Sequence, residues 1–255
     1  MTALEHVLER TVLIRAQRET VFRYFTDSAR FATWWGEGSS IEPRPGGALR
    51  IRYPNGVEAS GEVVEIVPVE RVLFTFGYES ADKPIPPGGS RVSVLLEETP
   101  QGTLVRLRHE LPTAESRDAH VPGWRYQLAL FANVVAREQH GDLAGRADRL
   151  LAAWTEPDAA KRRATLADVA AERVAFRDTF ACTEGLDDLV EHISASQMHM
   201  PGVRLERRGE PRQCQGTALV DWVARGGDGR ELGSGTNVLE LAPDGRIARV
   251  TGIWS

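Results

Sequence analysis

The stretch VFRYFTDSARFATWWG, residues Val21–Gly36, decides the fold because large apolar side chains crowd a short segment. Phe22 and Phe25 share one face of a first short helix with Val21. Asp27 is a residue type that caps a helix, so we expect a second helix to begin at Ser28 and to end at Gly36. Two short helices cannot bury this many large aromatic side chains against each other. The side chains need a concave surface from another part of the chain, which indicates a fold with a cavity.

The residues around this stretch predict the partner surface. A strand is expected at Val7–Ile14, and further strands follow Gly36, with Asn55-Gly56 as a strong hairpin signal. From Glu115 to Gln139 the pattern becomes helical, with one apolar stripe. The expected order is one strand, two short helices, antiparallel strands and a long helix. The later strands are expected at Leu49–Tyr53, Val57–Val67, Val72–Tyr78, Val92–Glu97 and Leu104–Leu111, and the stripe consists of Trp124, Leu128, Phe131 and Val135.

A second pattern begins at His140-Gly141-Asp142. Here helices come first and an antiparallel sheet follows, which is an α+β order. We expect each half to fold by itself. The expected elements are helices at Leu143–Trp154, Pro157–Ala171 and Gly185–Ile193, a short strand at Val174–Asp178, and strands at Val203–Arg208, Cys214–Ala224, Gly233–Leu241 and Ile247–Trp254.

Composition narrows the function. The chain has 255 residues, of which 42% are hydrophobic and 26% charged, as in a globular protein. Its net charge of −5 does not favour a nucleic-acid partner.

We find no long apolar run for a membrane helix and no signal peptide, so we expect a cytoplasmic protein in which Cys182 and Cys214 stay reduced. None of the six His has the spacing of a metal site, and there is no phosphate-binding loop, so no metal or cofactor is expected.

The first half contains the stretches ERTVLIRAQRETVFRYFTDSARFATWWG, PRPGGALRIRYPNG, SGEVVEIVPVERVLFTFGY and HVPGW. Through these residues it resembles the activator-of-heat-shock-protein-ATPase homologue family, within the START and birch-allergen-like superfamily. The resemblance implies a helix-grip domain over residues 1–139, with an antiparallel sheet wrapped around a long C-terminal helix. The superfamily includes lipid binders, aromatic cyclases and co-chaperone domains.

The second half contains a helix that reaches Trp154, VAFRD at Val174–Asp178, EGLDDLVEHI at Glu184–Ile193, and the ending DGRIARVTGIWS. Through these residues it is similar to SnoaL-like domains of the nuclear-transport-factor-2-like superfamily. The resemblance implies a cone-shaped α+β barrel domain over residues 140–255. That superfamily includes isomerases, cyclases, hydrolases and dehydratases.

Candidate ligand-binding residues are those that would line the two cavities. His109 lies on the strand face of Val105, Leu107 and Leu111, so it is either a ligand contact or a hydrogen-bonded core residue. Large aromatic residues form both core and pocket wall in such folds. The full set is Phe22, Trp35, Phe76, His109, Trp124 and Leu128 in the first half, and Trp154, Phe176, Trp222 and Asn237 in the second.

Two carboxylates are candidates for acid-base catalysis in the second half. Asp178 follows Val174 and Phe176 at a period of two, and an apolar wall would raise its pKa. The structural alternative is an Asp at a strand end that accepts hydrogen bonds from backbone amides. Asp221 shares a strand face with Leu219 and Val223, which we expect to point inward.

The leading hypothesis is the binding of a small hydrophobic molecule in one or both cavities. The first alternative is an acid-base enzyme of cyclase, isomerase or hydrolase type in the C-terminal cavity. The family resemblance adds a stress-related, co-chaperone-like role. A further alternative makes the second half a dimerisation module, with a homodimer formed through its sheet.

Overall fold

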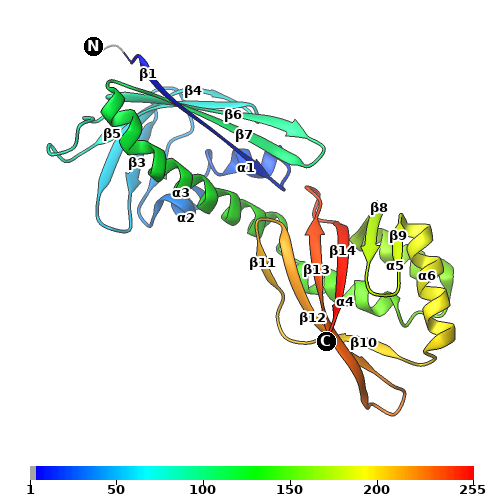
Figure 1. The fold of residues 1–255 in the computed structure, drawn as a ribbon. Coiled ribbons are helices and arrows are strands. Elements are labelled where there is room, and N and C mark those ends of the chain that lie inside the picture. Colours follow the sequence, from blue (N-terminus) through cyan, green and yellow to red (C-terminus); the bar gives the residue numbers. More distant parts are fainter. Residues whose placement is uncertain (1–3) are drawn as a thin grey trace. The chain divides into compact units, whose positions relative to one another are not determined.

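The computed structural model describes residues 4–255, so the first three residues of the expected first domain lie outside the described residues. The chain divides between Ala136 and Arg137 into two compact units, each with its own hydrophobic core (Figure 1). Independent folding of the two units stays a prediction.

The first unit is a seven-stranded antiparallel sheet with a long helix across one face (Figure 1). The strand order is β1-β7-β6-β5-β4-β3-β2, so the first strand pairs with the last. The strands are β1 (His6–Ile14), β2 (Ser40–Ile41), β3 (Ala48–Arg52), β4 (Glu58–Val67), β5 (Arg71–Tyr78), β6 (Ser90–Thr99) and β7 (Gly102–Leu111), and the helices are α1 (Arg18–Arg23), α2 (Ser28–Trp35) and α3 (Ala114–Gln139).

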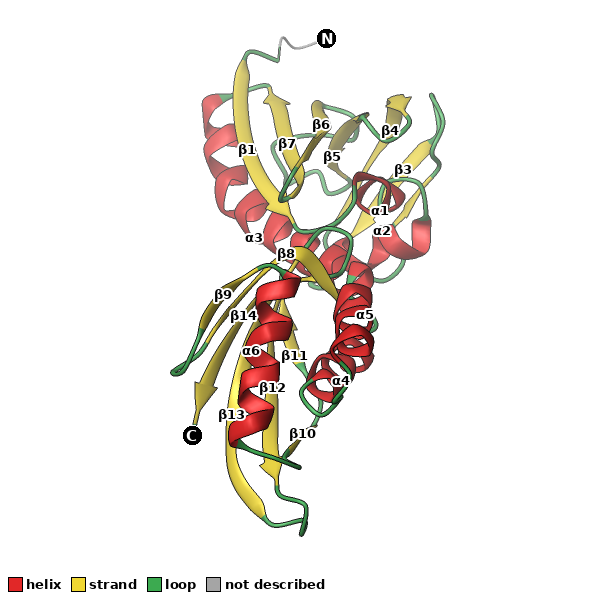
Figure 2. Cartoon of the chain, turned by 90° about the vertical axis from the view of Figure 1, so that its right-hand side faces the viewer, coloured by secondary structure: helices red, strands yellow, loops and turns green. Residues whose placement is uncertain are grey.

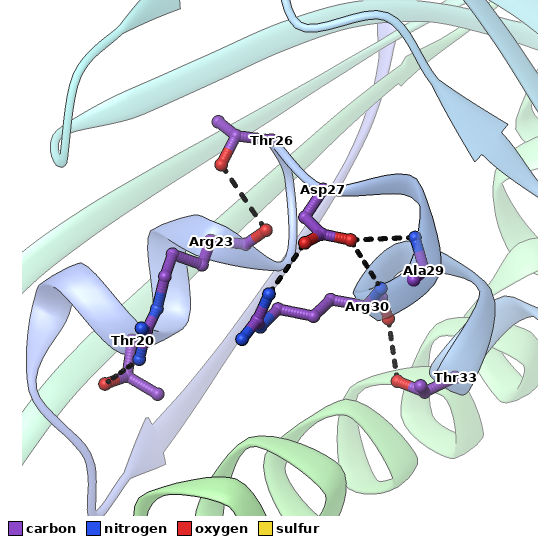
Figure 3. Close-up of polar contacts among 7 residues, drawn as sticks. All are labelled: Thr20, Arg23, Thr26, Asp27, Ala29, Arg30 and Thr33. Carbon is purple, nitrogen blue, oxygen red and sulfur yellow. Dashed lines mark hydrogen bonds and ion pairs between the residues drawn. The ribbon is translucent and has the colours of Figure 1, made fainter.

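The cap of α2 confirms the prediction made from Asp27. Its carboxylate accepts hydrogen bonds from the amides of Ala29 (2.8 Å) and Arg30 (3.1 Å) and pairs with the Arg30 guanidinium at 2.7 Å (Figure 3). These contacts, the Arg30 amide first, hold the pKa of Asp27 below its usual range. Gly36 ends the helix at φ 134°, and a Cβ there would lie 2.2 Å from the carbonyl oxygen of Arg52. Glycine is therefore required at this position.

The apolar stripe of α3 is buried as expected, and the aromatic helices pack on it. The Phe131 ring lies 5.4 Å from Phe25 and 4.6 Å from Trp34, measured between ring centroids. The α2 helix thus fills one side of the space between α3 and the sheet, and its two tryptophans face the same space.

The second unit packs three helices against one face of a seven-stranded sheet (Figure 2). The main strand order is β10-β12-β13-β14-β8-β9, and β11 pairs with β12. The helices are α4 (Leu143–Ala153), α5 (Ala159–Val169) and α6 (Leu186–His199), and the strands are β8 (Ala170–Arg177), β9 (Cys182–Glu184), β10 (Arg204–Arg207), β11 (Arg212–Cys214), β12 (Thr217–Arg225), β13 (Glu231–Leu241) and β14 (Ile247–Trp254).

This second sheet departs from the sequence-based expectation in its strands and in their pairing: β9 and β11 were not predicted, and β8 begins at Ala170, where a helix was expected. We expected only antiparallel pairs, but β8 pairs with β14 in parallel. The reason is topological: β8 and β9 precede α6 in the chain and β10 to β14 follow it, so β14 meets β8 after a long crossover. The arrangement remains α+β, and α6 extends to His199, beyond the predicted end at Ile193.

None of the helices within residues 4–255 is long and apolar enough to cross a membrane.

Candidate functional site

A cavity with a volume of about 720 Å³ lies between α2, α3 and the sheet of the first unit. Three of the predicted ligand-binding residues, Trp35, Phe76 and Trp124, line it. Sequence reasoning missed Tyr53, Tyr78, His120 and Gln127, whose contributions depend on contacts between distant segments. The remaining lining residues are Thr33, Trp34, Gly36, Pro54, Asn55, Val57, Lys83, Pro84, Ala119, Gly123, Tyr126 and Leu130.

Three predicted residues of the first unit lie outside this lining. Phe22 and Leu128 are buried in the core. His109 is completely buried on the inner face of β7, behind the cavity wall. The sequence left two roles open for His109, a ligand contact or a hydrogen-bonded core residue. Its contacts in the structure are those of the core residue.

A chain of hydrogen bonds fixes His109 in one tautomer. The indole N–H of Trp124 can only donate, and it reaches His109 Nδ1 at 2.9 Å. His109 Nε2 therefore carries the proton and donates to Ser90 Oγ at 2.8 Å. The Ser90 hydroxyl donates in turn to the carbonyl oxygen of Phe76 at 2.8 Å. The imidazole is neutral in this arrangement, and both of its nitrogens have partners.

Burial opposes the charged form of this imidazole. It lowers the pKa of His109 to about 3, and the nearby His120 adds to the effect. The rings of the two histidines lie 5.1 Å apart. His120 also has a pKa below its ordinary value because it is buried, although its hydrogen bond to Ser116 works in the opposite direction. Both histidines are therefore neutral near pH 7.

The cavity wall is continuous with this core. Trp124 packs edge-to-face on Trp35 at 5.7 Å, and Trp35 packs on Tyr53 at the same distance. Burial raises the pKa of Tyr53, and Tyr78 contributes to that shift. Because burial also raises the pKa of Tyr78, both phenols are protonated at neutral pH. The wall thus carries many aromatic side chains together with a few polar groups, among which Lys83 is charged.

The four predicted ligand-binding residues of the second unit, Trp154, Phe176, Trp222 and Asn237, line one small cavity. Its volume is only about 50 Å³ because aromatic rings fill the space: Trp222 lies 4.8 Å from Trp254, and Trp154 lies 5.5 Å from Phe176. The indole of Trp222 donates to Asn237 Oδ1 at 3.2 Å. A space of this size suits a water molecule rather than an organic ligand.

Arg162, which sequence reasoning missed, holds the wall of this small cavity. Its side chain is 1% exposed. The guanidinium donates to the carbonyl of Glu156 at 2.7 Å, to Ser194 Oγ at 2.6 Å and to Gln197 Oε1 at 2.7 Å. Gln197 lines the cavity and donates to the carbonyl of Trp154 at 2.9 Å. The buried cation therefore ties α5 to α6 and to the segment after α4.

Asp178 lies just beyond the end of β8 and does not line the cavity. Its Oδ1 accepts hydrogen bonds from the amides of Phe180 and Ala181, both at 2.8 Å, and its Oδ2 lies 3.4 Å from the indole nitrogen of Trp254. These are the contacts of the structural alternative, an Asp that closes a turn after a strand.

Asp221 points away from the cavity, opposite to the expected direction. On β12 the residues that join the core under the helices are Ala218, Val220, Trp222 and Ala224, so Asp221 falls on the other face. There it accepts a hydrogen bond from Thr236 Oγ1 at 2.6 Å and pairs with Arg212 at 3.4 Å. The alternation of side chains along a strand fixes this outcome once Trp222 is inside. Within residues 4–255, no three His, Cys, Asp or Glu side chains are placed to hold a metal ion.

We expect the stability of the first unit to fall as the pH is lowered from 6.5 to 5. The unfolded chain takes up a proton on His109 near its ordinary pKa, whereas the folded chain does not until about pH 3. The free energy of unfolding should therefore fall by about 1.4 kcal/mol per pH unit, or by about 2 kcal/mol over this range.

Urea denaturation at several pH values measures how steeply the free energy of unfolding depends on pH. His109→Gln removes the titration of His109 and should make the slope shallower, with the part due to His120 remaining. His199→Gln, at an exposed position, should leave the slope as in the wild type. Identical slopes in wild type and His109→Gln would contradict this account.

A second prediction concerns Asp178. Asp178→Ala should lower the free energy of unfolding by about 1 kcal/mol, because two amides lose their acceptor. Asp178→Asn should cost less, since an amide oxygen can still accept from both. Denaturant midpoints measure these changes, with Asp168→Ala, at an exposed position on α5, as the control. An Asp178→Ala variant as stable as the wild type would rule out the structural role.

Known proteins that resemble this chain each match about half of it. The family model described as "Activator of Hsp90 ATPase homolog 1-like protein" matches residues 15–136. An AHSA1-like protein from Rhizobium etli is 33% identical, covering 51% of this chain and 82% of its own, with a TM-score of 0.41. A SnoaL-like family protein from Agrobacterium tumefaciens, named as a candidate isomerase, is 30% identical, covering 46% of this chain and 98% of its own, with a TM-score of 0.43. Among curated proteins, none matches the chain.

The assignment to families depends on the sequence identities of 33% and 30% and on the shares of these two relatives that are covered, 82% and 98%. The matched family model lies within the first unit. The chain therefore belongs to the AHSA1-like family through its first unit and to the SnoaL-like family through its second.

Proposed function

We propose that the first unit binds a small, largely apolar molecule in the cavity between α2, α3 and the sheet. The observation that carries the proposal is the cavity itself, about 720 Å³ and walled by aromatic side chains. Ligand-binding pockets commonly have volumes of roughly 300–1,000 Å³ and are lined by apolar groups with a few polar ones.

The contrast between the units supports placing the ligand in the first. In the second unit the predicted ligand-binding residues surround about 50 Å³, and Trp222 and Asn237 already satisfy each other. Neither Asp178 nor Asp221 lines that space. Neither carboxylate that we predicted for acid-base chemistry is therefore placed to act on a molecule in that space.

Gly123 gives a direct way to close the proposed site. It lies on the cavity side of α3, between His120 and Gln127, and a Cβ added to it would have no heavy atom within 4 Å. A large side chain at this position would enter open space. The substitution would also remove a glycine from a helix interior. Glycine there is less favourable than alanine by about 1 kcal/mol, so its removal should not destabilise the helix.

We therefore predict that Gly123→Phe preserves folding and weakens the binding of anilinonaphthalene sulfonate, a fluorescent aromatic anion that reports on apolar sites, by roughly tenfold or more. Gly123→Ala should bind the probe like the wild type. So should Ala129→Phe, which adds the same ring to the same helix at an exposed position outside the cavity lining. Fluorescence titration measures the affinities. Equal affinity in wild type and Gly123→Phe would refute the proposed site.

A further inference from the structure

The cavity wall carries one pair of polar side chains that are bonded to each other. The hydroxyl oxygen of Tyr78, at the end of β5, lies 3.1 Å from Nε2 of His120 on α3. Nδ1 of the same imidazole lies 2.7 Å from the carbonyl oxygen of Ser116. Both side chains line the cavity, so a bound molecule would meet the pair directly.

The direction of these hydrogen bonds can be derived. A carbonyl oxygen only accepts, so Nδ1 of His120 must carry a proton. In the neutral ring Nε2 then has no proton and can only accept. The Tyr78 hydroxyl must therefore donate its one proton to His120. What Tyr78 still offers to the cavity is an oxygen lone pair, an acceptor.

A second phenol complements this acceptor. Tyr53 also lines the cavity, and its hydroxyl has no hydrogen-bond partner among the described residues 4–255. It is therefore available as a donor. A ligand hydroxyl that reaches both phenols would donate to Tyr78 while its oxygen accepts from Tyr53. A ligand carbonyl could use only Tyr53, because the Tyr78 proton is already committed to His120.

The aromatic side chains around this pair select the rest of the molecule. Trp35 packs edge-to-face on both Tyr53 and Trp124, which gives the cavity flat aromatic surfaces. Flat apolar rings pack well on such surfaces. We propose that the cavity selects a hydroxylated aromatic molecule of the phenol class, whose hydroxyl donates a hydrogen bond to Tyr78. This inference rests on the proposed function of the first unit and specifies its ligand.

The test compares naphthol with its methyl ether, which has the same rings but no donor. By isothermal titration, the wild-type protein should bind naphthol roughly tenfold more tightly than the ether, the worth of one hydrogen bond. Tyr78→Phe should abolish the preference, whereas Tyr126→Phe, at an exposed position on the cavity rim, should keep it.

His120→Phe provides an independent readout. Without the imidazole acceptor, the Tyr78 hydroxyl can donate to the ligand, so the ether should gain affinity relative to naphthol. A purely structural role of His120 would weaken both probes alike, and that result would overturn the inference.

The remaining outcomes separate the two proposals. Equal affinity of the two probes in the wild type, or a preference that survives Tyr78→Phe, would overturn the inference. If both probes bind equally and Gly123→Phe excludes both, the inference fails and the proposed function stands. If neither probe binds the wild-type protein, both proposals fail.

Discussion

The hydrogen bond from the Trp124 indole to His109 joins the long helix of the first unit to its sheet, and the cavity depends on it. A buried imidazole is costly unless its nitrogens have partners. Here the chain continues through Ser90 to the carbonyl of Phe76, so every member is satisfied. Because the network is complete, it stabilises one position of Trp124 rather than several. The Trp124 ring then forms the inner wall of the cavity and supports Trp35.

Both units have aromatic side chains in their interiors, but these side chains leave a large cavity only in the first unit. In the first, the long helix stands off from the sheet, and aromatic rings line the remaining space without filling it. In the second, rings from the sheet and from the segment after α4 meet across the interior, and the buried Arg162 clamps that segment to α6. Aromatic content alone therefore does not indicate a ligand site. What matters is whether the rings pack on one another across the space or only along its wall.

Much of the fold could be predicted because its signals are local. The Asp27 cap, the glycine at position 36 and the stripe that begins at Trp124 each depend on residues a few positions apart. The residues of the candidate site were harder to predict from the sequence, because they come from distant segments. Tyr78 and His120 are 42 residues apart, and no periodicity links them.

Asp221 shows a second kind of limit. Its strand has apolar residues on both faces, including the buried Val223 beside the buried Trp222 and Ala224, so alternation alone could not say which face was inside. Asp178 differs again: the sequence left two roles open, and only the positions of the Phe180 and Ala181 amides favour the structural one.

The most direct test of this account is the tautomer and titration of His109, measured by nitrogen-15 NMR of the imidazole in the full chain. The account predicts a neutral ring protonated at Nε2, with Nδ1 shifted as a hydrogen-bond acceptor, and no titration until the pH is well below the ordinary range of histidine. A ring protonated at Nδ1, or one that titrates near pH 6.5, would mean that Trp124 is not held by this bond, and the cavity would need another explanation.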